Sequence, residues 1–301
     1  MPDQIYFPVY ERLEKEVLEL SYSIYFSDDH IAVYSPNIAD LILRCSVELE
    51  AIAKDIFRKE TQTEPENPGS CFMWMEQQWK ISQKAISFHT PQFHFNDKFP
   101  KMLCPFAYKN DSPEDYYAQY NAIKHDRVKN LDKANLYTLL RVLGALFVLN
   151  LYYRDDKINL NNDRFGEKID KTMYSKIFSF YIAPCPDVIL LDSQKEINSD
   201  NCIYRIERNE LYYVFEMKYN DFFDECQSFK MFQTDVDFQQ YAKSLLGKNI
   251  SLNDLVEFVS KRSNMSQEEL EDHIIKKNKI KEIISITSVK MKSSYRCRLN
   301  K

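Results

Sequence analysis

The densest group of chemically useful side chains lies within residues 116–127. If this stretch is helical, Asn121 and His125 lie one turn apart on the same side, with Lys124 next to the histidine. Cations such as Lys124 and Arg127 disfavour the protonated form of a neighbouring imidazole, so His125 could act as base or acid on a ribose hydroxyl. The same cations could hold the adjacent phosphate. This arrangement is typical of metal-independent RNA cleavage.

The same residues also have a purely structural interpretation. His125 can be a hydrogen-bonded histidine of the protein interior, and Lys124, Asp126 and Arg127 can form salt bridges that stabilise the fold. The sequence leaves both interpretations open, because perturbed or buried histidines are not all functional.

Three segments together resemble the HEPN superfamily, the helical domains of many bacterial defence and toxin proteins. They are residues 43–50 with Lys54 behind them, residues 120–127 with the sequence YNAIKHDR, and an apolar stretch that ends LGALFVLNLYY. The resemblance covers roughly residues 1–155.

Catalytic members of that superfamily carry an arginine, usually followed by a polar residue, and then a histidine. Asn121 and His125 match the polar position and the histidine, whereas Tyr120 stands at the arginine position. The resemblance therefore implies RNase activity centred on His125 if Lys124 or Arg127 supplies the missing charge. It also implies an alternative, because many members are non-catalytic modules that dimerise or hold a partner.

A second constellation lies in the other half of the chain. Asp187 follows Pro186 at the start of an apolar run, and Glu216 and Lys218 end another run. The pattern resembles that of the PD-(D/E)xK nucleases, which implies that Asp187 and Glu216 bind Mg²⁺ while Lys218 helps activate water or stabilise the phosphate. Neighbouring strands would bring the carboxylates together, and alternation along a strand puts Glu216 and Lys218 on one face.

Helices are expected to position the first constellation. Apolar residues recur at helical spacing over residues 10–20, and Ser35 with Pro36 is typical of the start of a second helix, which ends before a loop at residues 61–70. The acidic residues of the first helix predict an acidic outer face: Glu11, Glu14, Glu16 and Glu19. Further helices are expected at residues 71–88, 112–129 and 133–154, the last as the apolar centre of a bundle.

The second half has a different pattern of short β-branched and aromatic runs. Strands are expected at residues 177–182, 188–191, 203–206, 211–217 and 283–291, with a hairpin turn at 208–210 and helices at about 222–246 and after Ser251 and Ser266. The expected fold class is therefore α+β. It consists of an all-α helical bundle over residues 1–155, a linker over 156–172 and a smaller α+β domain over 173–301.

Composition narrows the possible functions. The chain has only 4 glycines, and neither GxGxxG nor GxxxxGK[ST] can be written with them, which excludes glycine-built phosphate loops. The 7 cysteines form no CxxC pair, which favours a reducing cytoplasm. The most apolar stretch, residues 142–153, is shorter than the roughly 20 residues that span a bilayer, so we expect a cytoplasmic protein with no membrane partner.

Charge is distributed unevenly along the chain. Residues 276–301 carry a net charge of +8, and because the whole chain carries −5, the first 275 residues carry −13. A basic end on an acidic body can contact phosphate or can dock onto that body.

These patterns favour a nuclease of bacterial defence, a HEPN-like ribonuclease or toxin-type effector. Its site would contain Asn121, Lys124, His125 and Arg127, would need no cofactor, and would bind RNA or another nucleic acid, in a homodimer. One alternative is a Mg²⁺-dependent nuclease that uses Asp187, Glu216 and Lys218. Another is a non-catalytic module that dimerises or binds a partner protein.

Overall fold

A computed structural model describes residues 5–95, 102–107, 122–126, 128–160, 169–185, 198–219, 222–225, 236–246, 248, 257, 261, 266 and 285–301. The chain divides into two compact units. The first unit consists of Met1–Glu207 together with Arg296–Lys301, and the second of Arg208–Tyr295.

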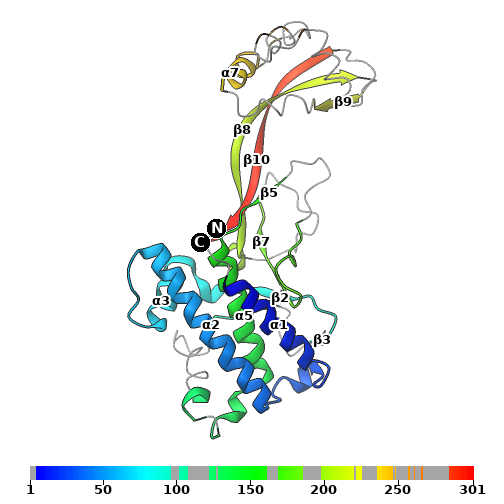
Figure 1. Cartoon of the computed structure of the whole chain (residues 1–301). Helices are drawn as coiled ribbons and strands as arrows, with labels where there is room; N and C mark the ends of the chain where they lie inside the picture. Colours follow the sequence, from blue (N-terminus) through cyan, green and yellow to red (C-terminus); the bar gives the residue numbers. More distant parts are fainter. Residues whose placement is uncertain are drawn as a thin grey trace. The chain divides into compact units, whose positions relative to one another are not determined.

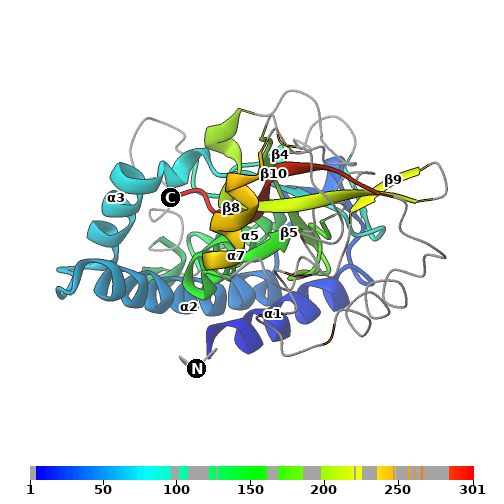
Figure 2. The ribbon, with the colours of Figure 1, turned by 90° about the horizontal axis from the view of Figure 1, so that it is seen from above.

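Helices form the body of the first unit (Figure 1). They are α1 (Tyr6–Leu20), α2 (Pro36–Thr61), α3 (Pro68–Trp79) and α5 (Leu136–Arg154). Helix α5 packs chiefly against α2 and also against α1, which itself contacts α2 (Figure 2). The aromatic rings of Tyr10 in α1 and Phe147 in α5 stack with centroids 5.6 Å apart, so the first and last of these helices share one core.

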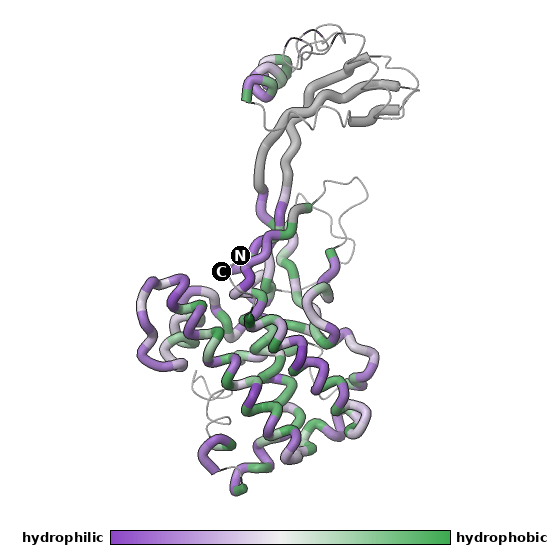
Figure 3. The backbone as a smooth tube through the Cα atoms, in the orientation of Figure 1, coloured by the Kyte–Doolittle hydropathy of each residue, from purple (hydrophilic) through white to green (hydrophobic). Residues whose placement is uncertain are grey.

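Helix α5 is buried nearly all round, as its sequence predicts. Among the described residues it is the helix long and apolar enough to cross a membrane, but 89% of that apolar window is buried inside the protein. Figure 3 shows its apolar course between the more polar outer helices. Burial by other helices is the pattern of the central helix of a soluble protein.

Local sequence explains where α2 begins and ends. The Ser35 hydroxyl accepts a hydrogen bond from the Ile38 amide at 3.2 Å, and Pro36 occupies the first turn. The helix ends where Gln62 adopts a left-handed conformation, with φ of 58°, and donates its amide to the Arg58 carbonyl. The predicted start of this helix is confirmed.

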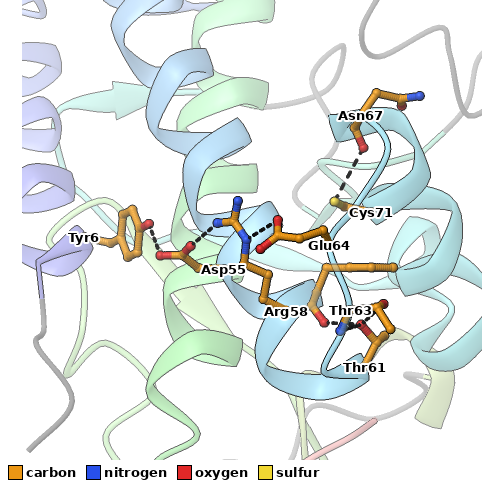
Figure 4. Close-up of polar contacts among 9 residues, drawn as sticks. Tyr6, Asp55, Arg58, Thr61, Thr63, Glu64, Asn67 and Cys71 are labelled. Carbon is orange, nitrogen blue, oxygen red and sulfur yellow. Dashed lines mark hydrogen bonds and ion pairs between the residues drawn. The ribbon is translucent and has the colours of Figure 1, made fainter.

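Polar contacts fix the connection between α2 and α3 (Figure 4). Arg58 reaches both Asp55 and Glu64 at 2.8 Å, and the hydroxyl of Tyr6 donates to Asp55, which ties α1 to the same group. Asn67 then caps α3 by accepting the Ser70 amide at 3.0 Å. The turn after α2 is thus secured by side chains from two helices.

Short strands also belong to the first unit. Strand β2 (Ile86–Phe88) pairs antiparallel with both β4 (Met102–Leu103) and β6 (Phe178–Phe180), while β1 (Phe26–Ser27) pairs parallel with β3 (Phe93–His94). Gly144 of α5 lies close to this sheet, because a Cβ atom there would come within 2.8 Å of the Ile86 side chain.

A further sheet has the strand order β5-β10-β8-β7, and β9 pairs with β8. Its strands are β5 (Ile158–Leu160), β7 (Ile182–Ala183), β8 (Tyr204–Tyr219), β9 (Phe222–Glu225) and β10 (Ser285–Leu299). The short helix α7 spans Val236–Ser244. Single-turn 3₁₀ helices complete the described elements: η1 (Asp28–His30), η2 (Ile81–Gln83), η3 (Leu131–Lys133) and η4 (Ser199–Asn201).

Several predicted elements differ from the structure. The third helix ends at Trp79 and not at residue 88, because Lys80 adopts a left-handed conformation with φ of 51°. The predicted turn at 208–210 lies inside the continuous strand β8, since none of these residues has the positive φ that a tight hairpin turn requires. Of the helix predicted at 222–246, residues 222–225 instead form strand β9, whereas residues 236–244 are helical, as α7. Residues 188–191, and most of the helices predicted at 112–129 and after Ser251, lie outside the described residues.

The mixed α+β class is confirmed at this coarse level. The first 155 residues are not purely helical, because β1 to β4 lie among them. The predicted linker at 156–172 falls within the first unit, which continues to Glu207. Hydrogen bonds from Ser175 and the amides after it to Glu14 of α1 explain why this segment belongs with the helices.

Candidate functional site around His125

His125 lies at the end of a helical turn, residues 122–125, in the first unit. Ile123 is fully buried, whereas Lys124 and His125 are both exposed. The turn is therefore anchored by one apolar side chain and presents the next two residues to solvent. Exposure contradicts the interpretation of His125 as an interior histidine.

Two side chains hold the chain that follows this turn. The amide group of Asn130 donates to the carbonyls of Ala122 at 3.1 Å and Asp126 at 2.8 Å. The carboxylate of Asp126 accepts the Lys129 amide at 3.1 Å, and the Lys129 ammonium lies 3.4 Å away. Asp126 thus has the structural role that the sequence left open, and its contacts fix the backbone beside His125.

The remaining residues of this constellation lie outside the described residues. They are Asn121 and Arg127, together with Tyr120 at the position of the family's arginine. The structure brings together Lys124 and His125, as neighbours on one turn.

The second constellation is described only in its backbone and only in part. Asp187 lies outside the described residues. Glu216 and Lys218 lie two residues apart in β8, which places them on one face of the strand. Their register partners in β9 are Glu225 and Phe223, respectively. A second acidic residue therefore stands directly opposite Glu216, which the sequence pattern alone does not reveal.

The described end of the basic C-terminal stretch docks onto acidic residues. The guanidinium of Arg298 lies 3.0 Å from Glu207, and the ammonium of Lys301 lies 2.7 Å from Glu60 and 3.4 Å from Asp155. The ammonium of Lys301 also lies 5.5 Å from the centre of the Trp79 ring. The charge pattern allows the basic end either to contact phosphate or to dock onto the acidic body. Arg298 and Lys301 dock onto acidic residues.

Sequence reasoning missed a buried carboxylate. Glu14 was expected on the acidic outer face of the first helix, but only 3% of it is exposed. Its carboxylate accepts hydrogen bonds from the hydroxyls of Tyr10 and Ser175 and from the amides of Lys176 and Ile177. Burial raises the pKa of Tyr10, and the nearby Glu14 charge raises it further. The spacing holds the clue, because Tyr10, Leu13, Glu14 and Val17 occupy positions i, i+3, i+4 and i+7 of one helix face.

A second buried charge is Lys84, of which 2% is exposed. Burial lowers its pKa to about 8, despite the opposing effect of Asp200. No sequence pattern marks this residue, because lysine is rarely buried.

A groove lies between α1 and α2, with a volume of about 620 Å³. Its apolar lining includes Val9 and Leu13 of α1 and Leu43 and Val47 of α2. Charged residues also line it: Arg12, Arg44 and Glu48. Over the described part of the chain, no group of three or more His, Cys, Asp or Glu side chains is placed to hold a metal ion.

We compared the chain with models of protein families, with curated proteins and with solved structures. No family model matches it, no curated protein matches it, and no solved structure matches it.

Proposed function

We propose that this protein is a nuclease of bacterial defence, of the HEPN-like kind, which cleaves RNA at a site centred on His125. The observation that carries the proposal is the exposure of His125 directly beside Lys124, on a turn that Ile123 anchors in the core. An exposed imidazole can exchange a proton with a bound ribose hydroxyl, and the neighbouring ammonium can hold the phosphate.

In the proposed reaction, His125 takes the proton from a ribose 2′-hydroxyl. That oxygen forms a bond to the adjacent phosphorus, and the bond from phosphorus to the 5′-oxygen breaks. The leaving oxygen takes a proton from a second His125, which a homodimer would bring to the same site. Lys124 and Arg127 stabilise the developing charge on the phosphate, and Asn121 positions the ribose.

Cleavage assays on purified protein test this proposal. Labelled single-stranded RNA and double-stranded DNA are incubated with Mg²⁺ and, separately, with EDTA. We expect RNA cleavage that EDTA leaves intact and that His125→Ala lowers about 100-fold or more, because general acid–base catalysis contributes about that much. His94→Ala is the matched control, because His94 is also an exposed histidine but lies in β3, and it should leave RNA cleavage unchanged. Intact RNA cleavage in a folded His125→Ala protein would contradict the proposal.

The backbone register of the second unit favours one alternative, a Mg²⁺-dependent nuclease. Glu216 and Glu225 are directly paired across β8 and β9. Like charges in such a pair are destabilising, and a divalent cation would offset their repulsion. Under this alternative EDTA abolishes cleavage, Lys218→Ala abolishes it, and His125→Ala does not.

The groove between α1 and α2 favours the other alternative, a non-catalytic module that binds a second copy of this chain. A two-fold interface places one patch against itself, so a patch with charges of both signs can pair Arg12 with the other copy's Glu48. Val47 is 55% exposed in this groove. Val47→Glu would then convert a dimer into a monomer in light scattering, whereas Met73→Glu, at a 51% exposed apolar residue of α3, would not.

A further inference from the structure

Lys84 is a buried cation without an acceptor among the described residues. It follows the turn η2 and precedes Ala85 and strand β2. Only 2% of the residue is exposed, and no hydrogen bond or salt bridge joins its ammonium to another described residue, so the acid that acts on its charge, Asp200, does so through space. A buried charge without a partner is costly, so such groups are normally paired or bind a ligand.

The chain around Lys84 is fixed against the turn η4. The side-chain amide of Asn201 donates to the Gln83 carbonyl at 2.7 Å, and the Ala85 amide donates to the Asn201 carbonyl at 2.9 Å. One residue of η4 therefore holds the backbone on both sides of Lys84. These contacts fix the backbone from which the Lys84 side chain extends.

The charges around Lys84 compensate its charge only in part. Its neighbouring acid, Asp200, is held by the Lys80 ammonium at 2.7 Å. The cation Arg205 is also close enough to act on Lys84, but it pairs with Glu207 at 2.7 Å. Glu207 is further bound by Arg298.

The neighbouring thiol of Cys202 supplies no charge at neutral pH. Burial raises its pKa to about 11, although Lys84 and Lys171 both act to lower it. Four cations thus share two carboxylates: Lys80, Lys84, Arg205 and Arg298 with Asp200 and Glu207. This cluster has an excess of about two positive charges on a chain whose net charge is −5.

We propose that Lys84 is the centre of a binding site for a phosphate group, which supplies the negative charge that this cluster lacks. A phosphate monoester carries about −2 at pH 7, which matches the excess. Its oxygens accept charge-assisted hydrogen bonds, and lysine is a common phosphate ligand. The site is separate from the proposed chemistry at His125 and does not depend on it.

The test titrates the full chain with inorganic phosphate at constant ionic strength and measures binding by calorimetry. Lys84→Met should weaken phosphate binding at least about tenfold, a difference that calorimetry resolves. Lys15→Met removes an equally charged but exposed lysine of α1 and should change the affinity less than about twofold. Phosphate bound at the proposed nuclease site does not depend on Lys84, so only the binding that Lys84→Met removes belongs to this site, and the two sites can fail separately.

Proton linkage provides a second measurement. Phosphate stabilises the charged ammonium, so the wild-type affinity should fall as the pH rises from 7 to 9, through the pKa of about 8 of Lys84. The Lys84→Met protein should lack that component of the pH dependence.

A labelling experiment keeps the proposal testable without any variant. At pH 8 the wild-type protein is treated with an amine-acetylating reagent, and mass spectrometry follows Lys84. Phosphate should protect Lys84 from acetylation, and chloride at the same ionic strength should not. Equal labelling with and without phosphate, or equal phosphate affinity of wild type and Lys84→Met, would overturn the proposal.

Two oligonucleotides distinguish the source of the phosphate group. A short single-stranded RNA with a 5′-phosphate is compared with the same RNA lacking it. If the 5′-phosphate strengthens binding and Lys84→Met removes that gain, the site takes a nucleic-acid end. If only inorganic phosphate depends on Lys84, the site takes the free ion. No dependence on Lys84 for any of these ligands would refute the site.

Discussion

Glu14 illustrates how a single charged residue can organise the first unit. Its carboxylate receives two hydroxyl and two backbone donors, and the two hydroxyls, those of Tyr10 and Ser175, also lie 2.9 Å from each other. The Ser175 oxygen additionally accepts the Phe178 amide at 2.8 Å. Because these donors come from α1 and from the chain that leads into β6, Glu14 joins segments that are distant in sequence. A buried carboxylate with four donors on one oxygen is costly to disturb.

Glu14→Gln should therefore destabilise the protein by about 2 kcal/mol, since hydrogen bonds to a charged group contribute about 1.5–3 kcal/mol and a neutral amide weakens them. Urea unfolding at pH 7 measures this change. Glu11→Gln, on the exposed side of the same helix, should change stability by less than about 0.5 kcal/mol. Equal stabilities of the two variants would show that the buried network contributes nothing.

Lys84 leads to a prediction about stability and pH. Its folded-state pKa of about 8 lies below the 10.5 of an unperturbed lysine, so between these values the unfolded state binds more protons and stability rises with pH. Below pH 8 the cost of burying the charge is fully present. Relative to Lys84→Met, the wild type should therefore gain on the order of 2 kcal/mol between pH 7.5 and 10.5 in the absence of phosphate. A pH-independent difference between the two proteins would contradict this assignment.

Among the elements, those with strong local signals could be predicted from the sequence. Ser35 and Pro36 give the start of α2, and the unbroken apolar run gives the buried helix α5. These features depend on residues within one or two turns.

The other elements depend on contacts between distant segments. Strand β2 has three residues and exists through pairing with β4 and β6, about 15 and 90 residues further along the chain. The same dependence on contacts between distant segments limits what the sequence reveals about the candidate sites. Spacing marks His125 and could have marked Glu14, but the backbone next to Lys84 is held by Asn201, which is more than 100 residues away.

Gly144 carries a prediction about the packing of α5 on β2. A Cβ at this position would lie 2.8 Å from the Ile86 Cδ1 atom, so Gly144→Ala should cost about 1–2 kcal/mol despite the higher helix propensity of alanine. Ile86→Val removes that atom. In the Ile86→Val background Gly144→Ala should therefore be neutral or stabilising, with a coupling of at least about 1 kcal/mol in a double-mutant cycle of urea unfolding. Additive effects would show that the two residues do not share this contact.

At the scale of the whole molecule, the two strands that leave the first unit do so side by side. The Asn300 amide donates to the Ile203 carbonyl at 2.7 Å, and Arg298 pairs with Glu207. Strands β8 and β10 run in opposite directions (Figure 1). Glu207 lies four residues after Ile203, and Arg296 lies four residues before Asn300, so the register set by the Ile203–Asn300 bond places Glu207 opposite Arg296. The ends of the second unit therefore meet at adjacent positions of one sheet.

This geometry predicts that the first unit folds alone. Residues 208–295 can be replaced by a two-residue Asn-Gly turn, which suits a tight hairpin between antiparallel strands. Because Glu14, Lys84, His125 and the docked C-terminal residues all belong to the first unit, the shortened chain should unfold in one cooperative transition.

The shortened chain also decides between the two catalytic proposals. It retains His125 and lacks Glu216 and Lys218, so under our proposal it should cleave RNA at about the wild-type rate in EDTA. If cleavage instead depends on Mg²⁺ bound with the help of Glu216 and Lys218, the shortened chain should be inactive. Thermal melting of the shortened chain provides the control for folding. A folded but inactive chain, made from a full-length protein that cleaves only with Mg²⁺, would show that cleavage needs residues 208–295, which include Glu216 and Lys218, and would remove His125 from the chemistry.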